Sequence, residues 1–302
     1  MQRPIVVVGS INMDLVLRTP RIPELGETLM GTAFAMHPGG KGANQAVGVA
    51  RLGYPVEMIG CVGHDEFGRS LCKQLRRDGV STAAIGSVDD ATGIATVMVD
   101  ERGENRIVVV PGANHAVKPV FLRSRQSVIE NAGLVLVQLE IPLDTVSFIA
   151  DLCQHSGVPL ILDPAPAQSL PSGMLSAATW ITPNETEAEI LTGGVLGPQE
   201  QAMKLNAAGA RNIIFKRGSA GASFYVEGDL LRHISAPSVS VRDTTAAGDG
   251  FNAAFAVALA RGKSVEDSVR FAVMAAAISV TRDGAQPSLP TLDEVEEAFA
   301  RR

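Results

Sequence analysis

The sequence has few cysteines, few aromatic residues and no excess of positive charge. Its three cysteines, Cys61, Cys72 and Cys153, are odd in number and scattered, and they lack the CxxC spacing of many zinc sites. We therefore expect buried thiols in a reducing compartment, with no disulfide framework. The chain of 302 residues carries a formal net charge of -6, so it lacks the electrostatic footprint of a protein that binds nucleic acid or anionic membranes.

Long hydrophobic runs are also missing. No apolar stretch reaches 18 residues, and the run before Gly9 is too short for the core of a signal peptide, so we expect a cytoplasmic protein. With 46% hydrophobic and 19% charged residues, the chain can bury a large core as one domain, or as one domain with an attachment. No internal repeat or low-complexity segment is present.

Strand-like and helical segments alternate from residue 134 onward. After an N-terminal strand over residues 4–8, strands are predicted at residues 134–138, 160–162, 180–182, 212–216 and 222–226, with helices between most of them. This alternation predicts an α/β fold with a mainly parallel sheet, whose ligands bind at the carboxyl ends of the strands. Polar or small residues follow four of these strands: Glu140, Asp163, Asn184 with Glu187, and Gly218. Each alone is typical of a loop, and their shared edge is the evidence for a site.

The first fifty residues hold two candidate binding groups. Asn12 and Asp14 lie two apart in an extended segment and so face the same side, where an amide and a carboxylate suit a vicinal diol. A solvated strand face is the alternative. A second strand is predicted over residues 28–36, ended by the sequence HPGG, before Lys41 opens a helix that continues to Leu52. Its first residues, GGKGANQA, lack the spacing of a P-loop.

Residues 92–110 contain two alternating runs around a charged turn at residues 100–105, which predicts a β-hairpin. Together with the strand-like pieces between residues 12 and 36, this hairpin forms a candidate small sheet, separate from the main one. One face of such a sheet needs a partner.

The segment VRDTTAAGDGFNAAFAVALA, residues 241–260, combines a small-residue turn with a helix. Its apolar residues recur at helical spacing from Phe251, which places Asp249 in the first turn. Unpaired N–H groups at a helix start attract anions, so a carboxylate there makes sense as a catalytic base. Helix capping by Asp249 is the structural alternative.

Three segments carry a resemblance to a known family. DTTAAGDGFNAAF is similar to the DTTGAGD signature of the ribokinase family of sugar kinases, also called the PfkB family, and GGKGANQA and TRDGAQPSLP resemble two further segments of that family. The resemblance covers essentially the whole chain. It implies a ribokinase-like three-layer α/β sandwich, one catalytic domain over residues 1–302, and a small β-sheet lid formed by residues 11–37 and 92–111. It also implies a homodimer formed through that lid.

The resemblance further implies a set of site residues for sugar, ATP, Mg²⁺ and K⁺. Asp249 is the implied base, with the backbone N–H groups of Ala247 and Gly248 stabilising the transferring phosphoryl group. The sugar contacts are Asn12, Met13, Asp14, Gly40, Lys41, Gly42, Asn44, Glu140 and Asp249. The nucleotide contacts are Asn184, Glu187, Lys216, Gly218, Ser219, Gly221 and Gly248, with Mg²⁺ near Asn184 and Glu187. The K⁺ ligands are Asp243, Thr245, Ser279, Arg282, Gly284 and Ser288, in part through backbone carbonyls.

Three positions depart from the family pattern. Gly250 replaces a larger small residue and is expected to open room beside Asp249. Val273 stands where a polar residue near adenine is usual, and Lys216 replaces a common threonine. The leading hypothesis is an ATP-dependent kinase acting on a primary hydroxyl, with D-ribose as the first candidate. The alternatives are a sister kinase for deoxyribose, fructose, a sugar acid or a nucleoside, and a non-catalytic sugar-binding regulator.

Overall fold

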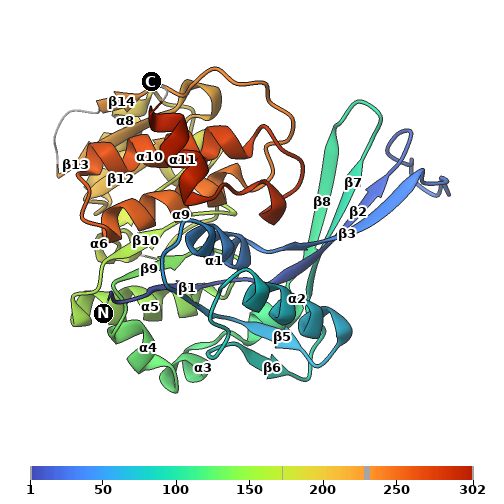
Figure 1. Ribbon diagram of the computed structural model, residues 1–302, viewed down its shortest axis with the longest axis horizontal. Coiled ribbons are helices and arrows are strands. Elements are labelled where there is room, and N and C mark those ends of the chain that lie inside the picture. The colour runs from blue at the N-terminus through green and yellow to red at the C-terminus, as the bar shows by residue number, and fades with distance from the viewer. Residues whose placement is uncertain (1, 172, 228–231, 301–302) are drawn as a thin grey trace.

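The computed structural model describes residues 2–171, 173–227 and 232–300, so a few positions of the predicted domain over residues 1–302 lie outside the described residues. An eight-stranded sheet crosses the molecule in the order β14-β13-β12-β11-β10-β9-β1-β4 (Figure 1). The six strands from β4 to β12 are parallel, and β13 and β14 are antiparallel. Their bounds are β1 Ile5–Val8, β4 Val56–Ile59, β9 Leu134–Val137, β10 Leu160–Leu162, β11 Trp180–Ile181, β12 Asn212–Lys216, β13 Ala222–Val226 and β14 Arg232–Ile234.

Helices cover both faces of this sheet because its central strands are apolar on both sides. In β1, Ile5 and Val7 belong to one core cluster and Val6 and Val8 to another. The first cluster packs against α1 Lys41–Arg51, α2 Glu66–Arg77, α9 Ala247–Ala260, α10 Val265–Ser279 and α11 Leu292–Ala300. The second packs against α3 Pro119–Arg123, α4 Gln126–Glu130, α5 Leu143–Ser156, α6 Met174–Ala177, α7 Glu185–Thr192 and α8 Pro198–Ala207. The predicted three-layer α/β sandwich is therefore confirmed (Figure 1).

Helix α9 is buried along most of its length, between α1 and α10. Its small residues permit this, since a Cβ at Gly48 of α1 would lie only 2.7 Å from the Cβ of Ala253. Gly250 acts in the same way: a Cβ there would lie 3.0 Å from Cδ2 of Leu289. The expectation that Gly250 opens room beside Asp249 was wrong, because the space is taken by the Leu289 side chain.

A separate four-stranded sheet projects from the main body (Figure 1). Its order is β3 Ala33–Gly39, β2 Asn12–Arg18, β7 Gly93–Val99 and β8 Asn105–Val110. The predicted hairpin is confirmed, since β7 and β8 pair antiparallel. The predicted break at residues 37–40 was wrong, because β3 runs on through Pro38 to Gly39. Pro38 is tolerated there since β3 is an edge strand.

A short parallel pair, β5 Cys61–Gly63 and β6 Gly86–Val88, completes the strands of the described residues. All three cysteines are free thiols; Cys61 and Cys153 are buried as expected, whereas Cys72 is half-buried. Within the described ranges, none of the helices combines the length and apolar character needed to cross a membrane.

Candidate active site

The start of α9 places Asp249 inside the protein, with 5% of its surface exposed. The turn before it is tight: Ala246 is the N-cap and takes the left-handed conformation, with φ of 59°. The Asp249 carboxylate does not cap the helix. Its Oδ2 accepts a hydrogen bond from Asn44 Nδ2 at 3.0 Å, and its Oδ1 accepts one from Gln45 Nε2 at 3.1 Å. The capping alternative is therefore wrong.

Helix α1 reaches this carboxylate because two glycines allow its start to lie against the end of β1. A Cβ at Gly42 would lie 2.7 Å from the carbonyl carbon of Gly9, and Gly40 has a φ of 87°. The next residue, Lys41, faces several acids. Burial lowers the pKa of Lys41, but Asp249, Asp163, Glu140 and Glu187 together raise it above its usual value. The ammonium group therefore stays charged and balances the acids around it.

Two acids predicted to bind sugar lie in the same neighbourhood as Asp249. Burial, followed by the nearby charges of Glu140 and Asp249, raises the pKa of Asp14 to about 7. Glu140 accepts hydrogen bonds from Ser10 Oγ at 2.5 Å and from the backbone N–H of Lys41 at 3.2 Å. The end of β9, the start of α1 and strand β2 therefore all contribute polar groups to the neighbourhood of Asp249.

The structure gives Asn12 and Met13 different surroundings. Asn12 is only 2% exposed and accepts a hydrogen bond from Asn114 Nδ2 at 2.7 Å, so the solvated-strand alternative is wrong for this residue. Met13 packs into the hydrophobic core. Only the backbone of Met13 is therefore placed to contact a sugar.

A polar cavity of about 290 Å³ opens beside Asp249. Asn184 and Glu187 form the capping box of α7, in which the N–H of Glu187 donates to Asn184 Oδ1 at 2.7 Å. Lys216 Nζ lies 2.7 Å from Asp163 Oδ1 and 3.9 Å from Glu187 Oε2. Burial raises the pKa of Glu187, with Lys216 opposing the shift. These residues line the cavity together with Lys41, Ala165, Gly218, Thr244, Ala246, Gly248 and Asp249.

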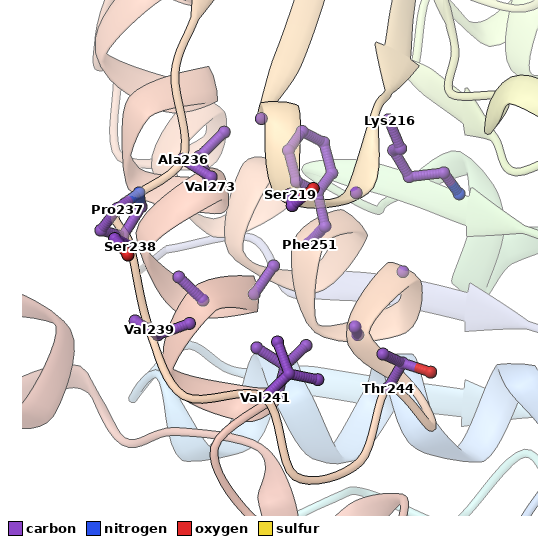
Figure 2. A pocket seen from close by; sticks show the side chains of 17 residues that line it. Lys216, Ser219, Ala236, Pro237, Ser238, Val239, Val241, Thr244, Phe251 and Val273 are labelled. Carbon is purple, nitrogen blue, oxygen red and sulfur yellow. The ribbon is translucent and has the colours of Figure 1, made fainter.

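A second, largely apolar cavity of about 420 Å³ adjoins the first (Figure 2). Lys216, Gly218, Thr244 and Gly248 line both cavities. Ser219 and Gly221, two of the residues predicted to contact the nucleotide, lie along the second one. Most of its remaining wall is apolar and includes Val239, Val241, Phe251 and Val273 (Figure 2). This pair of cavities suits a molecule with an apolar part and a charged part.

The residues predicted to bind a monovalent cation form two groups. Asp243 accepts hydrogen bonds from Thr245 N at 2.9 Å and from Gly284 N at 2.8 Å. Ser279 Oγ and Ser288 Oγ lie 2.9 Å apart. The Arg282 side chain turns away to pair with Glu294, so only the backbone of Arg282 is free to take part.

Sequence reasoning missed three polar residues beside the site: Gln45, Gln138 and Asn114. Gln45 stands next to Asn44 within GGKGANQA, and Gln138 is the last residue of a predicted strand, so both carried a signal that was not used. Asn114 carried none, because it joins Asn12 from 102 residues away along the chain. For Asp163, the sequence predicted only a position at the end of a strand.

Comparison with known proteins decides the family. Residues 2–292 match the family described as pfkB family carbohydrate kinase. The chain belongs to this family. It is a carbohydrate kinase of ribokinase type that uses ATP. The paired cavities and the buried acid at the start of α9 fit this activity.

Three similar proteins illustrate the relationship of this pfkB-family kinase. A ribokinase of Bacillus subtilis is 43% identical over 301 residues, covering 99% of this chain and all of that protein. A deoxyribokinase of Salmonella typhi is 34% identical, with 97% of each chain covered. The structure of Arabidopsis thaliana ribokinase complexed with ribose and ATP is 37% identical and superimposes with a TM-score of 0.93, covering 98% of each chain.

Proposed function

We propose that this kinase transfers the γ-phosphoryl group of ATP to the primary hydroxyl O5 of D-ribose. One observation carries the proposal: Asp249 lies where the polar cavity meets the half-buried Asp14 and the buried amides contributed by the first fifty residues. Relatives named ribokinase over nearly the full length of the chain support ribose as the substrate.

In this proposal the sugar is held by Asn12, Asp14, Lys41, Asn44 and Glu140, with Gly40 and Gly42 shaping the start of α1. Carboxylates and amides offer the acceptors and donors that adjacent hydroxyls need. Asp249 then accepts the proton of the attacking hydroxyl, the usual task of a carboxylate in phosphoryl transfer.

The transferring phosphoryl group is placed at the start of α9, where helix N–H groups favour negative charge. The N–H of Ala247 already donates to Thr244 O at 3.2 Å, so a phosphoryl group must displace that bond. Gly248 has no side chain to obstruct the approach and lines both cavities.

We place the adenosine of ATP in the apolar cavity and its phosphates beside Lys216 and Gly218. The oxygen donors of the polar cavity fit Mg²⁺, which takes oxygen ligands and keeps several waters. Asn184 and Glu187 would hold such an ion, and when bound it neutralises phosphate charge. Among the described residues no three His, Cys, Asp or Glu side chains form a metal cluster.

A panel of sugars tests the substrate. With saturating ATP, we expect kcat/KM to be highest for D-ribose, and 2-deoxy-D-ribose is the main competitor because a deoxyribokinase is among the relatives. The assay measures ADP release with ribose, deoxyribose, fructose, a sugar acid and a nucleoside. A preference of more than about tenfold for any other sugar, about 1.4 kcal/mol of transition-state discrimination, contradicts ribose as the substrate.

We further propose that K⁺ binds between the turn at Asp243 and the loop at residues 279–288. The carboxylate of Asp243 and the hydroxyls and carbonyls around it are the hard oxygen ligands such an ion prefers. Replacing K⁺ by a bulky organic cation should lower kcat at least fivefold, and Asp243→Asn should remove most of the dependence. Equal rates in both salts argue against this site.

The small sheet is proposed to act as a lid over the sugar and as the interface of a cytoplasmic homodimer. Apolar side chains are exposed on it, including Phe34 at 60% and Val108 at 66%. Sedimentation should show a dimer, and a monomer at micromolar concentration contradicts the interface.

A further inference from the structure

Behind Asp249 lies a hydrogen-bonded chain of buried side chains from separate elements. Gln45 of α1 donates through Nε2 to Asp249 Oδ1 at 3.1 Å and to Asp163 Oδ2 at 3.0 Å. Its Oε1 accepts from Gln138 Nε2 at 2.7 Å. The other oxygen of Asp163 accepts from Lys216 Nζ at 2.7 Å. Gln45 and Gln138 are both fully buried, so water does not compete for these bonds.

The direction of this chain follows from its acids. An ionised carboxylate only accepts hydrogen bonds, so Gln45 must turn its NH₂ group toward Asp249 and Asp163. Its carbonyl oxygen then faces Gln138, which must in turn present its own NH₂ group. Gln138 Oε1 has no hydrogen-bond partner among the described residues, so its orientation is set by Gln45 and not by a second partner.

We propose that Gln45 is a positioning residue for the catalytic base, and that Gln138 holds the Gln45 amide in the orientation that gives Asp249 a hydrogen-bond donor. This inference rests on the proposed function, because it takes Asp249 as the base. Neither glutamine is assigned a contact with sugar or nucleotide.

The need for such a donor comes from the charges that face Asp249. Asp163 after β10 and Asp14 of β2 both lie near it, whereas Lys41 of α1 is the nearby cation and Lys216 is paired to Asp163. Burial raises the pKa of Asp249 to about 6, with Lys41 lowering it, Asp163 raising it, and Asn44 and Gln45 lowering it. The two N–H bonds of Gln45 let two acids share one pocket while Asp249 stays ionised at neutral pH.

The test compares the pH dependence of kcat in the full-length enzyme and two variants. The wild type should lose activity as the pH falls through about 6, because a protonated Asp249 cannot accept a proton. Gln45→Met keeps the length of the side chain and removes both donors. It should lower kcat about 10- to 100-fold and move the acid limb up by about one pH unit, with the sugar KM within about twofold. Gln138→Met should give a smaller change in the same direction.

Gln201→Met is the matched control, since Gln201 is a buried glutamine of α8 with no hydrogen bond to the chain described above. It should leave the acid limb unchanged. If Gln45→Met does not fold, the comparison of Gln138→Met with the wild type tests the proposal by itself. The inference is overturned if the folded glutamine variants keep the acid limb of the wild type and have kcat values within about twofold of the wild-type value.

A second readout does not depend on the substrate. Carboxyl-carbon NMR of the sugar-free protein, with Asp249→Asn to assign the signal, should show a higher pKa of Asp249 in both glutamine variants. If the wild type phosphorylates no sugar, the proposed function fails, and this titration still tests the role of the two glutamines.

Discussion

Asp249→Asn should abolish turnover, lowering kcat by about a thousandfold or more, while the protein folds and binds sugar as before. The amide keeps the size of the carboxylate but cannot accept the hydroxyl proton, and general-base catalysis contributes about 10²- to 10⁴-fold. Single-turnover rates and calorimetric sugar binding check the two parts of this expectation separately. Near-normal turnover in the variant removes the assignment of Asp249 as the base.

The direction in which Asp249→Asn changes the stability of the fold can also be predicted. The pKa of Asp249 in the folded protein is about 6, above its ordinary value of 3.8, so the fold binds the proton more tightly than the unfolded chain does. The penalty for ionising Asp249 in the fold therefore grows as the pH rises from about 3.8 to about 6 and is fully present above pH 6. The neutral variant should have a Tm at pH 8 no lower than that of the wild type. Asp267→Asn, in the exposed first turn of α10, is the matched control and should keep full activity.

Lys41→Met should cause the second large loss, lowering kcat/KM about 10²- to 10³-fold and destabilising the fold. Removal of one partner from a buried set of charges costs about 3–5 kcal/mol, because the remaining charges are left uncompensated. Here Asp249, Asp163, Glu140 and Glu187 lose the cation that faces them. The measurement is thermal unfolding together with sugar phosphorylation.

The pH dependence separates this cause from a simple packing defect. Lys41 lowers the pKa values of Asp249 and Glu187, so without it both rise, and the variant should lose stability as the pH rises from 5 to 8 and regain it on acidification. Lys263→Met is the control, because Lys263 is exposed after α9. A Tm deficit for Lys41→Met that is the same at pH 5 and pH 8 contradicts the electrostatic explanation.

Local patterns in the sequence predicted much of the site. Asp249 was placed in the first turn of a helix by the spacing of Phe251 and the alanines after it, and Glu140, Asn184 and Glu187 were placed at strand ends. These predictions succeeded because helical periodicity and strand alternation depend on near neighbours. The strand through Pro38 was missed because an edge strand tolerates proline, and no local pattern distinguishes an edge strand from a central one.

The sequence by itself determined the α/β class, the family and the position of the candidate base, since each is written in short contiguous segments. Only the tertiary structure decided which polar groups surround that base. Gln45 meets Asp249 across 204 positions of the chain, Asp163 across 118 and Gln138 across 93. The order and twist of the parallel strands bring these residues to one edge of the sheet. Burial there turns acids and amides from helix starts and strand ends into an ordered hydrogen-bond chain, because an unpaired polar group away from water costs free energy.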